Sequence, residues 1–221
     1  MSEWWTYRLS DFLLFSPRTY FRLFELYNRD HWPLHLAAGL AGLLILAFAI
    51  RSRPAWRGRA TAILLAVAWA WVGWAFLLGR YQSINWTAKW FAAAFALEAL
   101  GLLWAGFSRD GITRVEHLGR RRIALALLIY AVLLHPFAGP LSGRSWSGVE
   151  LFGMTPDATV LATLGAVTLF ARRGRLALLV VPVVWCGISG ATLWALGAPD
   201  ASVLPVAAIF AIVVALRSRE E

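Results

Sequence analysis

Two ionisable residues, Glu98 and His135, lie within long apolar runs of the chain. A carboxyl group inside an apolar segment is costly to bury, and such groups commonly bind ligands or carry protons. Counted along a helix from Arg109 and Arg122, which bound these runs, they lie at depths of about 16 and 20 Å. We therefore predict that they meet as a proton-binding pair. In the alternative, each is a hydrogen-bonded packing residue, with His135 beside a kink at Pro136.

Six further residues are candidates for a ligand or proton site. Three lie near the ends of apolar runs, and three lie in the loop 139–157 or where it enters the next helix. They are Trp74, Arg80 and Asn85, then Arg144, Glu150 and Asp157. An aromatic ring at Trp74 suits a flat or cationic ligand, although membrane belts and packing also use tryptophan. Arg144 and Glu150 suit a gate or an anion contact, with an ordinary capped loop as the alternative.

Cofactor and metal chemistry is not predicted. The sequence has no phosphate-binding loop, zinc-hydrolase motif, nucleophile elbow or haem motif. Its one cysteine, Cys186, excludes an intrachain disulfide and a cysteine-rich metal site. Lys89 is its one lysine and stands at the wrong end of its run to hold retinal. We predict no catalytic residue and do not expect an enzyme.

The composition is typical of a polytopic membrane protein. Of the 221 residues, 60% are hydrophobic and 15% are charged, whereas a soluble domain has about 25% charged residues. The net charge is +9, but the arginines flank apolar segments, so orientation in a bilayer explains them better than nucleic-acid binding does.

Seven apolar runs predict an all-α fold with seven transmembrane helices, arranged as one span and three hairpins over residues 34–221. The runs are Leu34–Ile50, Ala60–Gly79, Trp90–Phe107, Ile123–Gly139, Ala158–Ala171, Leu176–Gly197 and Ala201–Leu216. The fifth is short for a span, because a helix needs about 20 residues to cross the hydrocarbon; it either thins the bilayer or packs inside the bundle. Two returning helices begin alike, with Pro-Asp-Ala-Thr at Pro156 and Pro-Asp-Ala-Ser at Pro199. These residues predict helix caps.

Arginines alternate between the two sides in a way that predicts topology. Most fall in the loops after the first, third, fifth and seventh spans, which the positive-inside rule places in the cytoplasm. The chain is therefore predicted to lie in a membrane with its N-terminus outside and its C-terminus in the cytoplasm.

An amphipathic helix is predicted near the N-terminus, within the segment 1–33. Arg18, Arg22, Glu25 and Arg29 form one stripe, opposite an aromatic and leucine-rich face. We expect this helix to lie in the outer interface with its rings at headgroup depth. The alternatives are a helix packed over the outer mouth of the bundle and a surface that docks a partner.

Three stretches resemble the DUF6064 family of uncharacterised bacterial membrane proteins. They are LSDFLLFSPRTYFRLFELYN, YQSINWTAKWFAAAFALEAL and HPFAGPLSGRSWSGVELFGMTPDATVLATLG, and together they make up about a third of the chain. The resemblance implies a multi-span protein of the bacterial inner (cytoplasmic) membrane with no established activity. Family members carry a cysteine beside the proline where this chain has Thr155-Pro156-Asp157, which argues against a metal-handling role.

The sequence leaves two functions open. The first is a small transporter or permease-like protein that acts on a small molecule or ion through a buried Glu/His site. The alternative is a non-catalytic membrane subunit or receptor-like module that binds a membrane protein partner. In both, the lipid bilayer surrounds the chain, and no nucleic acid is involved.

Overall fold

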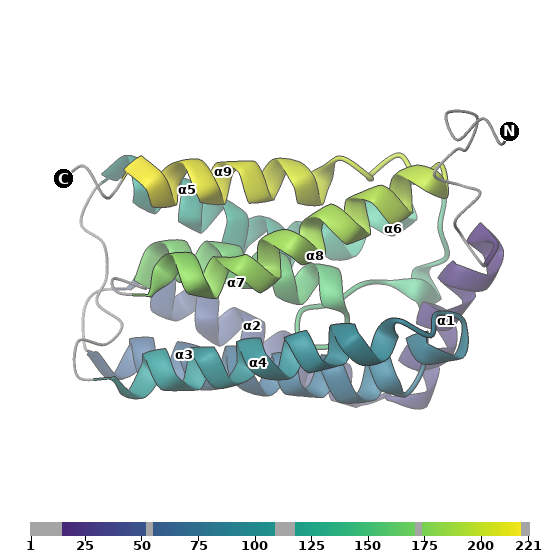
Figure 1. The fold of residues 1–221 in the computed structure, drawn as a ribbon, viewed down its shortest axis with the longest axis horizontal. Coiled ribbons are helices and arrows are strands. Elements are labelled where there is room, and N and C mark those ends of the chain that lie inside the picture. The colour runs from purple at the N-terminus through teal and green to yellow at the C-terminus, as the bar shows by residue number, and fades with distance from the viewer. Residues whose placement is uncertain (1–14, 52–54, 109–117, 171–173, 218–221) are drawn as a thin grey trace, which may run out of the picture.

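The computed structural model describes residues 15–51, 55–108, 118–170 and 174–217 as a bundle of helices (Figure 1). No strand occurs in these four stretches. The elements, in order, are α1 (Pro17–Asp30), α2 (Leu34–Ile50), α3 (Ala55–Trp71), η3 (Val72–Leu78), η4 (Tyr81–Ser83), α4 (Ala88–Phe107), α5 (Leu118–Ile129), η5 (Tyr130–Leu134), α6 (His135–Leu141), η6 (Trp146–Gly148), α7 (Pro156–Phe170), α8 (Arg175–Ala195) and α9 (Val203–Arg217). The predicted all-α fold is confirmed.

Fewer helices than the seven predicted spans have the length and apolar composition to cross a membrane. Four helices are long and apolar enough to cross a membrane, namely Trp56–Ser83, Ala88–Phe107, Leu118–Leu141 and Arg175–Ala195. The number of candidate spans rises to five if α1 and α2, which are bent by 97° relative to each other, are counted as one broken span. The apolar helices Pro156–Phe170 and Val203–Leu216 are shorter. All seven predicted runs are helical over most of their described residues, but seven spans are not confirmed.

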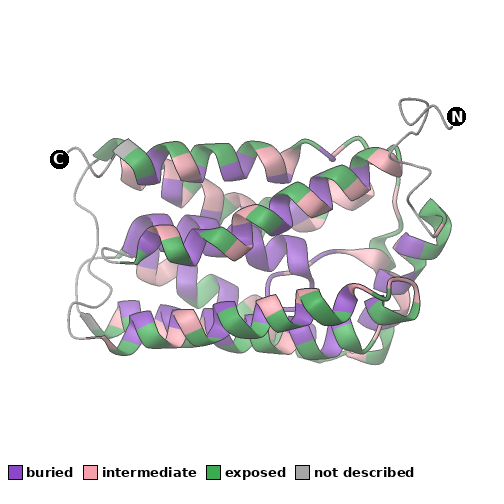
Figure 2. Cartoon of the chain, viewed as in Figure 1, coloured by how far each residue is buried: buried purple, intermediate pink, exposed green. Residues whose placement is uncertain are grey.

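Helix α7 is the centre of the bundle. Every residue from Pro156 to Phe170 is buried (Figure 2), and α7 packs against α5, α8, α9, α3 and η5. Its 15 residues span about 22 Å. The predicted fifth span is therefore a short helix enclosed by other helices. Because protein surrounds it on all sides, it does not need to match the thickness of a bilayer.

Two features of the α7 sequence let it occupy the centre. A Cβ atom on Gly165 would lie 2.8 Å from Leu128 Cγ and 2.9 Å from the Ala124 carbonyl oxygen, so glycine allows α5 to approach closely. The Thr163 hydroxyl donates to the Thr159 carbonyl at 2.8 Å and accepts from the indole of buried Trp69 at 2.7 Å. Such bonds satisfy buried hydroxyl groups within the helix and with its neighbour.

Helix α7 begins inside the bundle. Figure 1 shows the chain running inward from the end that carries α1 before α7 starts. This entry segment, residues 149–155, is not helical, and most of it is buried. The Gly153 amide donates to the Thr159 hydroxyl at 2.9 Å. Buried backbone that is not helical needs hydrogen bonds from the surrounding protein, and this bond is one of them.

The predicted amphipathic helix is α1, and it forms a lid over one end of the bundle. Ser16 caps it by accepting from the Thr19 amide at 3.2 Å. Its buried face packs on the bundle through rings such as Phe24, whose centroid lies 5.0 Å from that of Phe76. These rings face protein and not headgroups, so the structure agrees with the alternative of a helix over the mouth.

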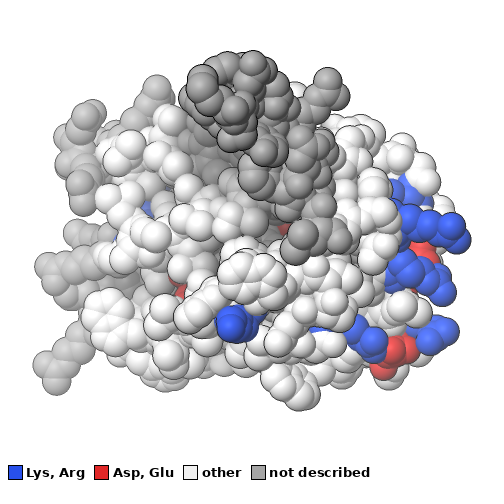
Figure 3. Space-filling model, turned by 45° about the vertical axis from the view of Figure 1, so that its right-hand side comes forward, with Lys and Arg blue, Asp and Glu red and all other residues white. Residues whose placement is uncertain are grey.

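Two polar contacts fix this lid. The Asn28 amide donates to the Ser147 and Val149 carbonyls, at 2.9 Å each. Asp30 pairs with Arg80, which precedes η4. Figure 3 shows basic and acidic side chains gathered at the right edge of the molecule, where α1 lies. The opposite end of the bundle carries the arginines at the helix ends, Arg51, Arg57, Arg59, Arg120, Arg121, Arg122 and Arg175.

A buried polar site at the start of helix α7

Asp157 is the second residue of α7 and is buried inside the bundle. Its two carboxylate oxygens accept from α8, one from the Trp185 indole and one from the Ser189 hydroxyl, at 2.7 Å each. The carboxylate was predicted to cap the backbone of its own helix, but it bonds side chains of the neighbouring helix instead. The positive end of the α7 dipole and the two donors favour its charged form, while burial opposes it.

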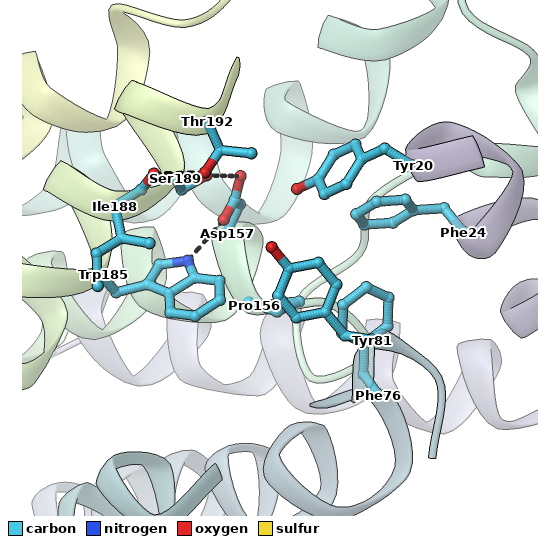
Figure 4. A pocket seen from close by; sticks show the side chains of 10 residues that line it. All are labelled: Tyr20, Phe24, Phe76, Tyr81, Pro156, Asp157, Trp185, Ile188, Ser189 and Thr192. Carbon is cyan, nitrogen blue, oxygen red and sulfur yellow. Dashed lines mark hydrogen bonds between the residues drawn. The ribbon is translucent and has the colours of Figure 1, made fainter. Parts of the chain in front are cut away.

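A small cavity lies beside Asp157 (Figure 4). It has about 10 Å³ of space for water centres, which is room for one water molecule. The hydroxyl groups of Tyr20, from the lid, and Tyr81, from η4, point toward Asp157. The lining residues are Tyr20, Phe24, Phe76, Tyr81, Pro156, Asp157, Trp185, Ile188, Ser189 and Thr192.

A second group of charged side chains lies close to Asp157. Arg144 pairs with Asp200 and, at 3.5 Å, with Glu150. His135 Nε2 lies 3.9 Å from Glu150 Oε2. Asp157 is near enough for its charge to act on Glu150, Asp200 and Arg144. We call His135, Arg144, Glu150, Asp157 and Asp200 the acid cluster.

The acid cluster has more acidic groups than one guanidinium can balance. Glu150, Asp157 and Asp200 are carboxyl groups, and Arg144 is their one arginine partner among the described residues. Full ionisation would leave uncompensated negative charge in the interior, which is costly. Glu150 Oε2 and both ring nitrogens of His135 are buried and have no hydrogen-bond partner. The cluster therefore needs an additional positive charge, carried by a proton or a bound cation.

The structure brings together four of the eight predicted site residues, namely His135, Arg144, Glu150 and Asp157. The kink predicted at Pro136 appears as a π-helical turn, η5, directly before His135. Such turns are rare and frequently occur at functional sites. A second one, η3, ends just before η4, which carries Tyr81 to the cavity.

The predicted pair of Glu98 and His135 is not formed. Helix α4, which carries Glu98, packs mainly against α3, η3 and α8. Helix α6, which begins at His135, contacts η5 and η6, and the preceding α5 packs against α7, α2 and α9. Figure 1 places α4 and α5 along opposite edges of the bundle. The expectation that successive spans lie side by side was wrong here, because α7 and α8 lie between them. Glu98 is 3% exposed, and its Oε1 has no hydrogen-bond partner.

The other three predicted residues lie outside the acid cluster. Trp74 is 65% exposed on the outer surface. Arg80 holds the lid through Asp30. Asn85 accepts from the Thr87 amide and donates to the Tyr81 hydroxyl at 3.1 Å, so it positions a cavity residue without lining the cavity.

Sequence reasoning missed Tyr20, Tyr81, Trp185, Ser189 and Asp200 as site residues. The repeated Pro-Asp dipeptide identified Asp200 as a cap, and its repetition was the signal available for a shared role. Nothing local distinguishes Trp185 or Tyr81 from the many other aromatic residues. Among the residues with described positions, no three His, Cys, Asp or Glu side chains are grouped so as to hold a metal ion.

Comparison with protein families gives one match. A model described as "Family of unknown function (DUF6064)" matches residues 18–221. Searches of the curated proteins and of the solved structures give no match.

Proposed function

Since the chain belongs to the DUF6064 family of unknown function, which supplies no activity, we propose one from the site: a small proton-linked membrane transporter. The observation that carries this proposal is the break before α7. A non-helical segment enters the bundle, a short helix starts inside it, and a buried carboxylate stands at that start. Discontinuous helices of this kind hold the substrate and ion sites of many transporters.

The acid cluster is the proposed proton-binding site. His135 and Glu150 replace the Glu98 and His135 pair expected from sequence, and Arg144 competes with protons for the same carboxyl groups. Protonation of Glu150 weakens its attraction to Arg144. The Arg144 guanidinium carbon also lies 4.8 Å from the centroid of the Phe21 ring in the lid. Proton binding would thus loosen the lid over the cavity.

The proposed setting is a bacterial cytoplasmic membrane. The arginine-rich end faces the cytoplasm and the lid faces outside, following the positive-inside rule. The exposed leucine and tryptophan side chains of α2, α3 and α4 then face lipid.

Transport requires water to reach the cavity, and cysteine labelling tests this without a known substrate. Replacing Cys186, the one native cysteine, with alanine gives a background in which Ser189→Cys is introduced. Ser189 lies six residues before the end of α8, about 9 Å along the helix. We expect a membrane-impermeant cationic methanethiosulfonate to label it in vesicles. The matched control is Ala162→Cys in the same background, at a buried position outside the cavity, and it should stay unlabelled.

The proton link is tested by the pH dependence of that labelling. Relative to a free thiol, Ser189→Cys should be labelled faster as the pH falls, because protonation of Glu150 leaves Asp200 as the one charged partner that holds Arg144 against the lid. Adding Glu150→Gln should remove this dependence, whereas Glu98→Gln should keep it. Equal behaviour of the two glutamine variants would contradict the assignment of the proton site.

A non-catalytic subunit is the second candidate, and the small volume of the cavity and the wholly enclosed α7 favour it. A subunit that only docks a partner needs no water path to Ser189. Absence of labelling in folded protein, at every pH tested, would reject transport and support this role.

A further inference from the structure

We propose that the cavity beside Asp157 binds a small primary ammonium ion of the methylammonium class; the inference names a substrate class for the proposed transporter. Five of its ten lining residues are aromatic, none is basic, and one is a carboxylate. Aromatic faces carry negative electrostatic potential and attract cations. The lining therefore selects for positive charge.

The hydrogen-bonding groups fit a primary ammonium group in particular. Such a group has three N–H donors. The cavity offers the Asp157 carboxylate and the hydroxyl groups of Tyr20 and Tyr81, which point toward it (Figure 4). The Tyr81 hydroxyl accepts one bond from Asn85 and keeps a second lone pair for the ligand. A quaternary ammonium ion carries the same charge but cannot donate.

Charge favours a cation over an anion. A helix N-terminus usually attracts anions, but the carboxylate of Asp157 already occupies the start of α7. The acid cluster also needs positive charge, because Arg144 faces three carboxyl groups. A monovalent cation beside Asp157 supplies it.

Size restricts the ligand. The cavity has room for about one water molecule, so its size matches an ammonium group, the methyl group of methylammonium requires the wall to adjust, and tetramethylammonium is too large. The lid contributes Tyr20 and Phe24 to the wall. The contacts of Asn28 and Asp30 hold this part of the wall in place.

The test is equilibrium binding of radiolabelled methylammonium to the purified full chain in detergent, by scintillation proximity. We expect saturable binding that excess methylammonium displaces and that equal concentrations of tetramethylammonium or potassium do not. Asp157→Asn should weaken binding at least tenfold, since it removes a charge-assisted hydrogen bond. Glu98→Gln, a buried acid outside the cavity, should bind like the wild type.

Tyr81→Phe keeps the test informative if Asp157→Asn does not fold. It removes one hydroxyl from the wall and should weaken methylammonium binding several-fold while leaving the elution volume on gel filtration unchanged. Absence of saturable binding, equal displacement by potassium, or wild-type affinity in Tyr81→Phe would each overturn the proposal. Cysteine labelling at Ser189 is measured without methylammonium. A failure of the cation assignment is therefore distinguishable from a failure of the transport proposal.

Discussion

Replacing Gly165 with alanine tests the central packing of α7, on which the position of Asp157 depends. The added Cβ would meet Leu128 Cγ at 2.8 Å, the Ala124 carbonyl oxygen at 2.9 Å and the Leu128 amide nitrogen at 3.0 Å. Two of these three atoms belong to the backbone of α5 and cannot rotate away. Relief requires α5 and α7 to separate, and overpacking of this kind costs about 1–3 kcal/mol.

Helix propensity acts in the opposite direction. Alanine is favoured over glycine in a helix interior by about 1 kcal/mol, so the net destabilisation is about 0–2 kcal/mol. Gly39 in α2 is the matched control, because a Cβ there meets nothing within 4 Å. Gly39→Ala keeps the propensity gain without the clash. The two variants should therefore differ by about 1–3 kcal/mol.

Thermal unfolding in detergent measures this difference. For a protein of this size, 1 kcal/mol shifts the Tm by about 2–4 °C. We expect Gly39→Ala to unfold at or above the wild-type temperature, and Gly165→Ala several degrees below Gly39→Ala. Equal unfolding temperatures for the two variants would refute the close approach of α5 and α7, and with it the enclosed position of α7.

Three further predictions concern the lid and the topology. Arg29 and Arg80 hold the pKa of Asp30 below its ordinary value, although partial desolvation opposes them. Because the pKa is lower in the folded state, the charged Asp30 stabilises the lid fully at pH values above its ordinary pKa. This stabilisation is lost as the pH falls through the folded pKa. Limited proteolysis of α1 should therefore accelerate at acid pH in the wild type, and cleavage of Asp30→Asn should already be fast at neutral pH. A cleavage rate of the wild type that does not depend on pH would contradict the role of the Asp30–Arg80 pair in holding the lid. Asn28→Ala leaves two carbonyl oxygens without their partner and should destabilise the protein by about 1–3 kcal/mol in thermal unfolding, whereas an unchanged Tm would argue that water replaces the amide. A fluorescent protein fused after Arg217 should fluoresce, because that end is predicted to be cytoplasmic. If a phosphatase that is active only in the periplasm is instead active at the same position, the orientation is the opposite of the predicted one.

Several features of the site were visible in the sequence because they depend on local chemistry. Arg144, Glu150 and Asp157 were identified because charged residues are conspicuous in an apolar chain, and His135 because it adjoins Pro136. The role of each was less accessible. Asp157 looks like a cap, since Asp next to Pro at a helix start is a common cap, but its carboxylate turns to α8.

The partners of His135 could not be deduced from span order. Depth along a helix follows from a rise of about 1.5 Å per residue, and Glu98 and His135 were placed at similar depths on that basis. Adjacency of helices follows from side-chain packing across the bundle, which a count of residues does not contain. The insertion of α7 and α8 between α4 and α5 separated the two residues.

The sequence by itself determined the class of fold and the positions of the helices, because apolar runs bounded by arginine and glycine fix where a helix can be buried. It also determined that α1 is amphipathic, since a period of 3.6 residues separates its charged stripe from its rings. Only the tertiary structure decided that α1 covers the bundle, that α7 is enclosed, and that the acid cluster forms. The physical reason is that these arrangements depend on which apolar faces pack together, as at Gly165, and an apolar face is equally suited to lipid and to another helix.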